Sequence, residues 1–349
     1  MRVGLKDVAT LAGVSVKTVS NVVNDYPFIS APTRERVKAA ISTLNYRPNL
    51  SARQLRTGRS GLIALSLPDI QSPYFAELAS LMVQEAQPYG WMVLIDETGG
   101  DRQHERRVAA GIRDNLIDGS IASPLSMTTA DVAVLGPAHP IVLLGERLEA
   151  GPVDHIAVNS ISAARDATNH LIDLGRRRIA AIGSIEGQVG TAAVRLEGYC
   201  LALREAGRRV ERRLIQPGNG FRRADGYTST MALLEQTKHP DAIFCFNDLM
   251  ALGALRAIHE RGLSVPDDIA VIGFDDIDAG LYSSPTLSTI APDKAYIVTR
   301  TMSLMSRRLD GDPDWTPQEY ETPYTLIARE STVGADRIGN AHVLQSGLP

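Results

Sequence analysis

Two hydrophobic patterns alternate along most of the chain. From residue 62 onward, short uninterrupted apolar runs are separated by longer stretches in which apolar residues recur every three or four positions. The short runs are typical of strands buried on both faces, and the longer stretches are typical of amphipathic helices. The runs are LIALSL (62–67), WMVLI (91–95), GSIAS (119–123), IVLLG (141–145), HIAV (155–158), RIAAIG (178–183), AIFCF (242–246) and IAVIG (269–273). Roughly ten strands are too many for a single regular sheet, so this pattern predicts two similar α/β lobes with parallel sheets.

The first residues show only the helical period. Three short helices are predicted: one over 6–12, one that begins at Ser15, and one from Ser30 to about residue 44. Gly13 can supply the turn between the first two, and both serines can cap the helices that follow them. This is a helix-turn-helix pattern, although a helical hairpin without function is the alternative. The residues expected to face a common core are Val8, Ala9, Leu11, Ala12, Val14, Val19, Val22, Val23, Val37, Ala40, Ile41 and Leu44.

The second helix presents a polar set that suits a DNA groove. Lys17 can donate to guanine acceptors or to phosphate, and Asn21 can pair with a base edge. Val16 can touch a thymine methyl group, while Thr18 and Ser20 suit phosphate oxygens. The sequence therefore predicts that this helix lies in the major groove.

Charge is distributed unevenly along the chain. Residues 1–60 hold ten lysines and arginines against three acidic residues, a net charge of +7, while the remainder holds 26 basic and 37 acidic residues, a net charge of −11. A basic segment before an acidic body predicts a polyanionic partner for the first segment alone. A solvated basic surface without a partner is the alternative.

The segment after the third helix combines arginines with one large apolar side chain. Pro48 stops the third helix, and a short helix is predicted over 50–56. Such a helix is too short to be stable by itself. Its residue Leu55 could enter the minor groove and kink the duplex, or could pack on the body as part of a linker. The arginines around it are Arg53, Arg56 and Arg59.

Two stretches carry a family resemblance: LKDVATLAGVSVKTVSNVVN and ISAPTRERVKAAISTLNYRPNLSARQLRTGRSGLIAL. They closely resemble the head and hinge of the LacI/GalR (lactose-repressor) family of bacterial transcription regulators. The resemblance implies that Val16, Lys17 and Asn21 read bases and that Leu55 enters the minor groove. The chain departs from the family at Gly4, where many relatives have Thr or Ser as the first helix cap. The residues predicted to contact DNA are Lys6, Ser15, Val16, Lys17, Thr18, Ser20, Asn21, Asn49, Ala52, Arg53 and Leu55.

Polar residues gather where the apolar runs of the body end. Asp69, the pair Asn247-Asp248 and the pair Asp275-Asp276 each follow such a run. Ligands of parallel α/β sheets bind beyond the carboxyl ends of the strands, which in a two-lobed body means the cleft. Carboxylates, amides and guanidinium groups there suit a ligand with many hydroxyls. Asp248 more readily caps the following helix, and Asp276 more readily makes a structural turn.

The remaining length resembles the effector domain of the same family, which is similar to periplasmic sugar-binding proteins. The matching stretches are PDIQSPYFAEL, HLIDLGRRRIAAIG, VRLEGY, FNDLMALGALRAIHERGLSVPDDIAVIGFDDID and SPTLSTI. The resemblance departs at Gly145, where many relatives have an acidic or amide residue. The residues predicted to bind an effector, partly from the resemblance, are Asp69, Tyr74, Phe75, Arg195, Phe221, Asn247 and Asp275.

These features predict an all-α helix-turn-helix head at 1–47, a hinge helix and linker at 48–59, a two-lobed periplasmic-binding-protein-like α/β body at 60–334, and a tail at 335–349. The first lobe is expected to hold about 60–158 and 291–321, and the second about 159–290 and 322–334.

Other classes of protein are disfavoured. The chain has no Walker phosphate loop, GxSxG elbow, CxxC or HExxH motif, its histidines are scattered, and Cys245 lies in a core-like run. We therefore predict no catalytic residue, no cofactor and no metal. The beginning of the chain lacks a signal-like apolar segment, which disfavours a secreted solute-binding protein and predicts a cytoplasmic, nucleoid-associated location.

The predicted function is a ligand-responsive transcriptional regulator that binds a palindromic DNA operator as a homodimer. A sugar or sugar derivative in the cleft is the expected effector, with a nucleobase or nucleoside as the alternative, because Tyr74 and Phe75 could stack a flat ring. A sugar-binding protein or a glycoside-cleaving enzyme is a weaker alternative. The tail shows no sustained leucine heptad, so a dimer is favoured over a tetramer.

Overall fold

The computed structural model describes residues 3–23, 26–46, 59–110, 116–135, 139–146, 151–185, 190–218, 220–335 and 344–345. The chain divides into two compact units, Met1–Ser60 and Gly61–Pro349. We refer to the first as the head and to the second as the body.

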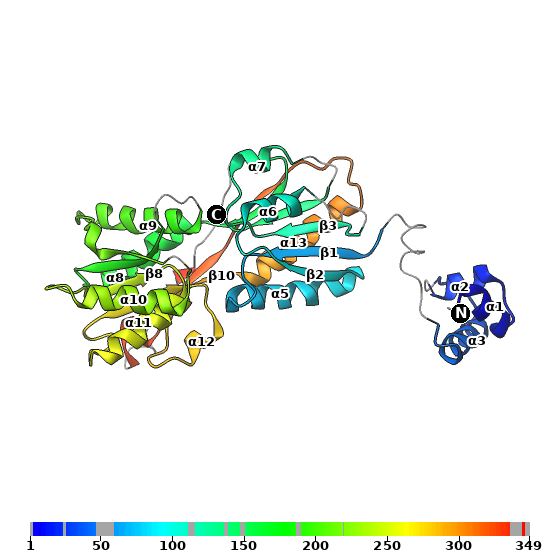
Figure 1. Ribbon diagram of the computed structural model, residues 1–349, viewed down its shortest axis with the longest axis horizontal. Helices are drawn as coiled ribbons and strands as arrows, with labels where there is room; N and C mark the ends of the chain where they lie inside the picture. Colours follow the sequence, from blue (N-terminus) through cyan, green and yellow to red (C-terminus); the bar gives the residue numbers. More distant parts are fainter. Residues whose placement is uncertain are drawn as a thin grey trace. The chain divides into compact units, whose positions relative to one another are not determined.

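The head contains α1 (Leu5–Ala12), α2 (Val16–Val23) and α3 (Ala31–Thr43) (Figure 1). Gly13 adopts a left-handed φ of 63° between α1 and α2, a conformation that glycine adopts without strain. The predicted core is largely confirmed, with Val8, Val19 and Val37 fully buried. Leu11 is an exception, because it lies beside the buried stripe of a short helix and is 52% exposed. The head is therefore a helix-turn-helix unit with a small core.

The two predicted serine caps differ. The Ser15 hydroxyl accepts a hydrogen bond from the backbone N–H of Thr18 at 3.0 Å, as expected for a cap of α2. The Ser30 hydroxyl instead donates to the hydroxyl of Thr33 at 2.9 Å, so its predicted cap bond is not formed. At Gly4, the Asp7 carboxylate accepts from the Gly4 N–H at 2.8 Å and partly replaces the missing cap side chain.

The first lobe of the body has a six-stranded parallel sheet in the order β11-β5-β4-β3-β1-β2. Its helices cover both faces, with α5 and α13 on one side and α6 and α7 on the other (Figure 1). The bounds are β1 (Leu62–Leu67), α5 (Pro73–Ala86), η1 (Gln87–Tyr89), β2 (Met92–Glu97), α6 (Arg102–Ala109), β3 (Gly119–Ala122), α7 (Thr129–Ala133), β4 (Ile141–Leu144), β5 (Asp154–Val158), α13 (Lys294–Leu309) and β11 (Glu319–Thr322).

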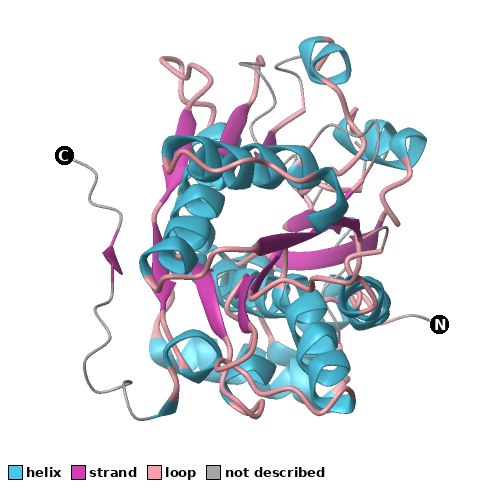
Figure 2. Cartoon of the chain, turned by 90° about the vertical axis from the view of Figure 1, so that its left-hand side faces the viewer, coloured by secondary structure: helices cyan, strands magenta, loops and turns pink. Residues whose placement is uncertain are grey.

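The second lobe has a seven-stranded sheet in the order β13-β12-β10-β9-β8-β6-β7. Helices again lie on both faces of the strands (Figure 2). The bounds are α8 (Ser160–Asp173), β6 (Ile179–Ser184), α9 (Thr191–Glu205), η2 (Arg212–Leu214), β7 (Ile215–Pro217), α10 (Arg223–Leu234), β8 (Ala242–Cys245), α11 (Asp248–Glu260), β9 (Ala270–Phe274), α12 (Asp278–Leu281), β10 (Ser288–Pro292), β12 (Tyr324–Ile327), α14 (Glu330–Val333) and β13 (Leu344–Gln345).

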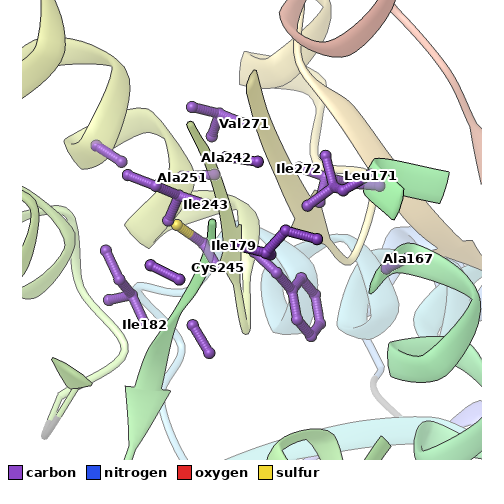
Figure 3. Packing of buried hydrophobic residues seen from close by; sticks show 14 of the residues in the cluster. Ala167, Leu171, Ile179, Ile182, Ala242, Ile243, Cys245, Ala251, Val271 and Ile272 are labelled. Carbon is purple, nitrogen blue, oxygen red and sulfur yellow. The ribbon is translucent and has the colours of Figure 1, made fainter. Parts of the chain in front are cut away.

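The core of the second lobe explains the long apolar runs. Ile179, Ile243, Cys245 and Ile272 point from adjacent strands into packed side chains of the flanking helices (Figure 3). Cys245 is fully buried there, which agrees with the core role predicted for it. Strands covered on both faces need apolar side chains at every position, so their runs are uninterrupted.

The parallel sheets that the sequence predicts are present, with antiparallel pairing added at one edge. β12 pairs antiparallel with β10 and with β13, in the second lobe. Five of the described strands were not among the predicted apolar runs: β7, β10, β11, β12 and β13. β7 and β11 are edge strands with exposed positions, and β10 and β12 carry hydroxyl side chains, so these strands lack the continuous apolar signal.

The chain crosses between the lobes three times. It leaves the first lobe after β5 and after β11, and leaves the second lobe after β10. The crossings therefore follow Val158, Pro292 and Thr322, and all three residues line the cavity described below. A ligand in that cavity would therefore lie next to the crossings, about which the two lobes would rotate.

Candidate functional site

The head presents the predicted DNA-contacting side chains on α2 and at its beginning. Lys17 and Val16 are exposed, Val16 by 40%, and Asn21 is half-buried at the end of the helix. Thr18 and Ser20 are also half-buried, while Lys6 is exposed on α1. The Ser15 and Thr18 hydroxyls lie 2.9 Å apart and share a hydrogen bond. The four predicted hinge contacts lie outside the described residues: Asn49, Ala52, Arg53 and Leu55.

The body contains a cavity of about 670 Å³ that is lined by both lobes. This volume is within the range of small-molecule sites in proteins. Its walls include all seven residues predicted to bind an effector: Asp69, Tyr74, Phe75, Arg195, Phe221, Asn247 and Asp275. The structure therefore brings these residues together, and their contact with an effector stays a prediction.

Arg195 is the central cation of the cavity. Its side chain is only 9% exposed, and its Nη1 lies 3.8 Å from the Asp275 carboxylate and donates to the carbonyl of Phe246. The guanidinium carbon lies 3.5 Å above the ring centroid of Phe274, a cation–π contact. Within the described part of the chain, the buried Nε of Arg195 has no hydrogen-bond partner. An unsatisfied buried donor costs about 1–3 kcal/mol, which an acceptor atom of a ligand would offset.

Asp275 is held in a strained conformation at the end of β9. Its φ is 109° and that of Asp276 is 50°, both in a region that L-residues rarely adopt. Burial raises the pKa of Asp275 to about 6, although Arg195 and Lys294 oppose that shift. Strain of this kind persists where the surroundings impose it and is concentrated at functional sites.

Neighbouring side chains impose this turn. The Asp276 carboxylate accepts from Arg329 Nη2 at 2.7 Å, and the Asp276 carbonyl accepts from Lys294 Nζ at 2.9 Å. Asp248 is fully buried and accepts from the Ile277 N–H at 2.9 Å and from the Thr289 hydroxyl at 2.7 Å. Burial, followed by the charge of Asp275, raises the pKa of Asp248 well above its ordinary range.

The predicted cap role of Asp248 was wrong. Asn247 caps α11, since its Oδ1 accepts from the Met250 N–H at 2.9 Å. Its Nδ2 donates to the carbonyl of Phe221 at 2.9 Å, and the backbone of Phe221 also has a positive φ of 53°. A cap residue precedes the first helical residue, so the sequence allows the helix to begin after either Asn247 or Asp248. The hydrogen bonds of Asp248 to residues distant in sequence decide for Asn247 as the cap. The structural turn predicted at Asp276 is present.

Aromatic and charged residues both line the cavity. Tyr74 and Phe75 pack edge to face, with ring centroids 5.2 Å apart. Burial, followed by the charge of Asp275, raises the pKa of Tyr74, so this phenol stays neutral. Asp69 of the first lobe pairs with Arg222 of the second at 3.1 Å, and both residues line the cavity. This pair joins the lobes in the described structure.

Sequence reasoning missed Glu146, which lies one position after the Gly145 departure. Glu146 lines the cavity from the end of β4. Its carboxylate accepts from the hydroxyl of Ser160 at 2.9 Å and is hydrogen-bonded by Thr191. These are the first residues of α8 and α9, whose positive helix ends favour an anion. Burial nevertheless raises the pKa of Glu146. The sequence offered one indication of this role, namely an acidic residue directly after Gly145, where many relatives have an acidic or amide residue.

Ser160→Ala is expected to destabilise the protein by about 1.5 kcal/mol at neutral pH, because it removes a donor to a buried carboxylate. The loss should shrink under acidic conditions, as the pH falls through the raised pKa of Glu146 and the charge disappears. Urea unfolding at neutral and acidic pH measures both. Ser162→Ala, at a half-buried position on the same helix, is the matched control. An equal loss at the two pH values would contradict the role of Glu146.

Among the described residues, no helix is long and apolar enough to cross a membrane. The same residues contain no group of three histidine, cysteine or acidic side chains placed to hold a metal ion.

Comparison with protein-family models gives two matches. Residues 4–49 match the family of bacterial regulatory proteins of the lacI type, and residues 168–332 match the periplasmic binding protein-like domain. The first segment lies in the head, and the second covers most of the second lobe together with α13 and β11 of the first.

Full-length relatives and solved structures agree with these matches. The HTH-type transcriptional repressor PurR of Histophilus somni is 34% identical over 309 residues, which is 87% of this chain and 92% of the relative. The lac repressor dimer bound to operator and the anti-inducer ONPF has 28% identity and a TM-score of 0.82, covering 95% of this chain and 99% of its own. The CelR–cellobiose complex has 28% identity and a TM-score of 0.68, covering 95% and 100%.

Proposed function

Because the chain belongs to the LacI family of bacterial regulatory proteins and is a ligand-responsive DNA-binding repressor of that family, we propose that its effector is a nucleobase or a nucleoside. The effector binds in the cavity of the body, and two chains address the two halves of a palindromic operator through their α2 helices. The protein then acts in the cytoplasm, where the chromosome lies. The relatives carry the names of transcriptional repressors, which supports a regulatory role.

The pairing of Arg195 with Asp275 inside an aromatic cavity carries the choice of effector. Arg195 offers an unpartnered donor and Asp275 offers an acceptor, and the edge of a nucleobase presents both acceptors and donors. Phe75, Tyr74 and Phe221 supply apolar surface for the faces of a flat ring. The relatives named PurR also favour this alternative over the carbohydrate that the polar strand ends predict.

A carbohydrate remains the second candidate. Carboxylates accept hydrogen bonds from vicinal hydroxyls. Among the described residues, four carboxylates line the cavity: Asp69, Glu97, Glu146 and Asp275. A similar solved structure is the complex of CelR with cellobiose, at 28% identity. This observation keeps sugars in the experiment below.

The test is thermal unfolding of the full chain against nucleobases, nucleosides, sugars, sugar phosphates and polyols. A compound that binds only the folded state raises the melting temperature by mass action. At a concentration of 100 times its Kd, the free energy of unfolding rises by about 2.7 kcal/mol. Stabilisation by a base or a nucleoside supports the proposal, and stabilisation by a sugar alone replaces it with the second candidate. Asp275→Asn is the control, since a compound bound elsewhere stabilises both proteins equally.

The switch is the second part of the proposal. The Asp69–Arg222 pair, the Glu146–Ser160 bond and the three crossings all join the lobes beside the cavity. An effector that changes these contacts changes the angle between the lobes, which we propose alters operator affinity by a coupling free energy of about 1–3 kcal/mol. Operator titrations with and without the stabilising compound measure this coupling and its sign.

A further inference from the structure

Two aromatic side chains of the head lie outside its core. Phe28 is 82% exposed and Tyr26 is 47% exposed, with ring centroids 5.5 Å apart in an edge-to-face arrangement. Each aromatic ring buries about 150–250 Å² when it packs, so this pair is a costly surface to leave in water. Adjacent exposed aromatics form a patch, which marks a contact with another molecule more strongly than a single apolar residue does.

The fold holds this patch in place. The Tyr26 N–H donates to the carbonyl of Asn21, in α2, at 2.9 Å. Arg34 of α3 donates from Nη2 to the carbonyl of Tyr26 at 2.8 Å. Ile29, the residue after Phe28, packs against the head core. Phe28 is therefore displayed on a loop segment anchored before and after it.

The patch continues the surface that the proposed function assigns to DNA. Tyr26 is bonded to Asn21, which is predicted to read a base edge, so the patch adjoins the end of α2. The head carries a net charge of +7, which favours a polyanion over a neutral or basic protein surface. Duplex DNA is a polyanion that also exposes apolar deoxyribose edges and thymine methyl groups.

We propose that Tyr26 and Phe28 extend the DNA contact of the head, with Phe28 packed on deoxyribose and thymine methyl groups beside the bases that α2 reads. This inference rests on the proposed binding of DNA by the head. Phenylalanine makes such apolar contacts with thymine methyl groups in the major groove. The contact carries no charge and displaces no counterion, which distinguishes it from the lysine and arginine contacts.

The first experiment measures binding of the full chain to a fluorescein-labelled duplex that the wild-type protein has selected from a random pool. Phe28→Ala is expected to weaken binding on the order of tenfold at every salt concentration, with an unchanged slope of log affinity against log salt. Leu11→Ala, at another exposed apolar position of the head, is expected to leave binding unchanged. Unchanged affinity of Phe28→Ala would overturn the inference.

The second experiment places a reporter at the patch. In Phe28→Trp, the emission of the new indole is expected to be quenched at saturating duplex, compared with the wild-type protein, which has Trp91 and Trp315 only. No quenching beyond that of the wild type overturns the inference. A lower melting temperature of the head in Phe28→Ala would assign the patch to folding and would also overturn the inference. A loss of dimer mass would assign the patch to contact with a second copy, with the same consequence. If the wild type selects no duplex, the proposed function itself fails.

Discussion

Asp275→Asn is expected to abolish the response to the effector while making the effector-free protein more stable at neutral pH. The asparagine keeps the shape of the side chain but removes a buried charged acceptor. Loss of one partner of a buried charge-assisted hydrogen bond weakens binding on the order of 100-fold. Operator affinity without effector should stay within a few-fold of the wild type, because Asp275 lies in the body and not in the head.

The gain in stability follows from the pKa of Asp275. Burial raises this pKa from 3.8 to about 6, so the folded state binds a proton more tightly than the unfolded state does. Its charged form therefore costs about 3 kcal/mol at neutral pH, which the neutral asparagine avoids. As the pH falls through about 6, the wild-type carboxyl is protonated and this advantage of the variant shrinks. Below about 3.8 the advantage should vanish.

Chemical unfolding at several pH values and calorimetric titration with the stabilising compound measure the two effects. Asp278→Asn is the matched control, because Asp278 is exposed in the first turn of α12, three residues away. It should change neither property. A variant that loses effector binding and also loses stability at neutral pH would instead make Asp275 a structural residue whose charge supports the fold.

Asn21→Ala is expected to weaken binding to the selected operator by about 1–3 kcal/mol, which is roughly fivefold to 150-fold, while binding to random duplex changes little. The reason is that an amide contact to a base edge is made only on the correct base. Asn21 is suited to this role, because it lies at the end of α2 and is partly exposed.

Lys6→Ala, at an exposed position of α1 in the same head, provides the contrast. A lysine contact to phosphate supports binding to every sequence, so its loss should weaken both duplexes alike and reduce the salt slope by about 1. If Asn21→Ala weakens both duplexes equally, then Asn21 supports the fold or a phosphate contact and does not read a base. Competition binding at several salt concentrations separates these outcomes.

Several parts of the site were predictable because they depend on local order. Strand ends carry the ligand-binding side chains of parallel sheets, so Asp69, Asn247 and Asp275 could be picked from their places after apolar runs. Arg195 and Phe221 lie outside such positions, and the family resemblance supported their choice. Glu146 was missed because the expected position, 145, is a glycine, and only the fold shows the next side chain at the cavity.

What the sequence by itself determined is the helix-turn-helix head, the α/β class of the body and the strand ends that line the cavity. These follow from hydrophobic period, turn chemistry and charge, which act over a few residues. The tertiary structure decided the antiparallel edge at β12, the exposure of Leu11, the choice of Asn247 over Asp248 as a cap, and the link from Glu146 to α8 and α9. Each of these depends on partners distant in sequence, whose burial and hydrogen bonds no local pattern specifies.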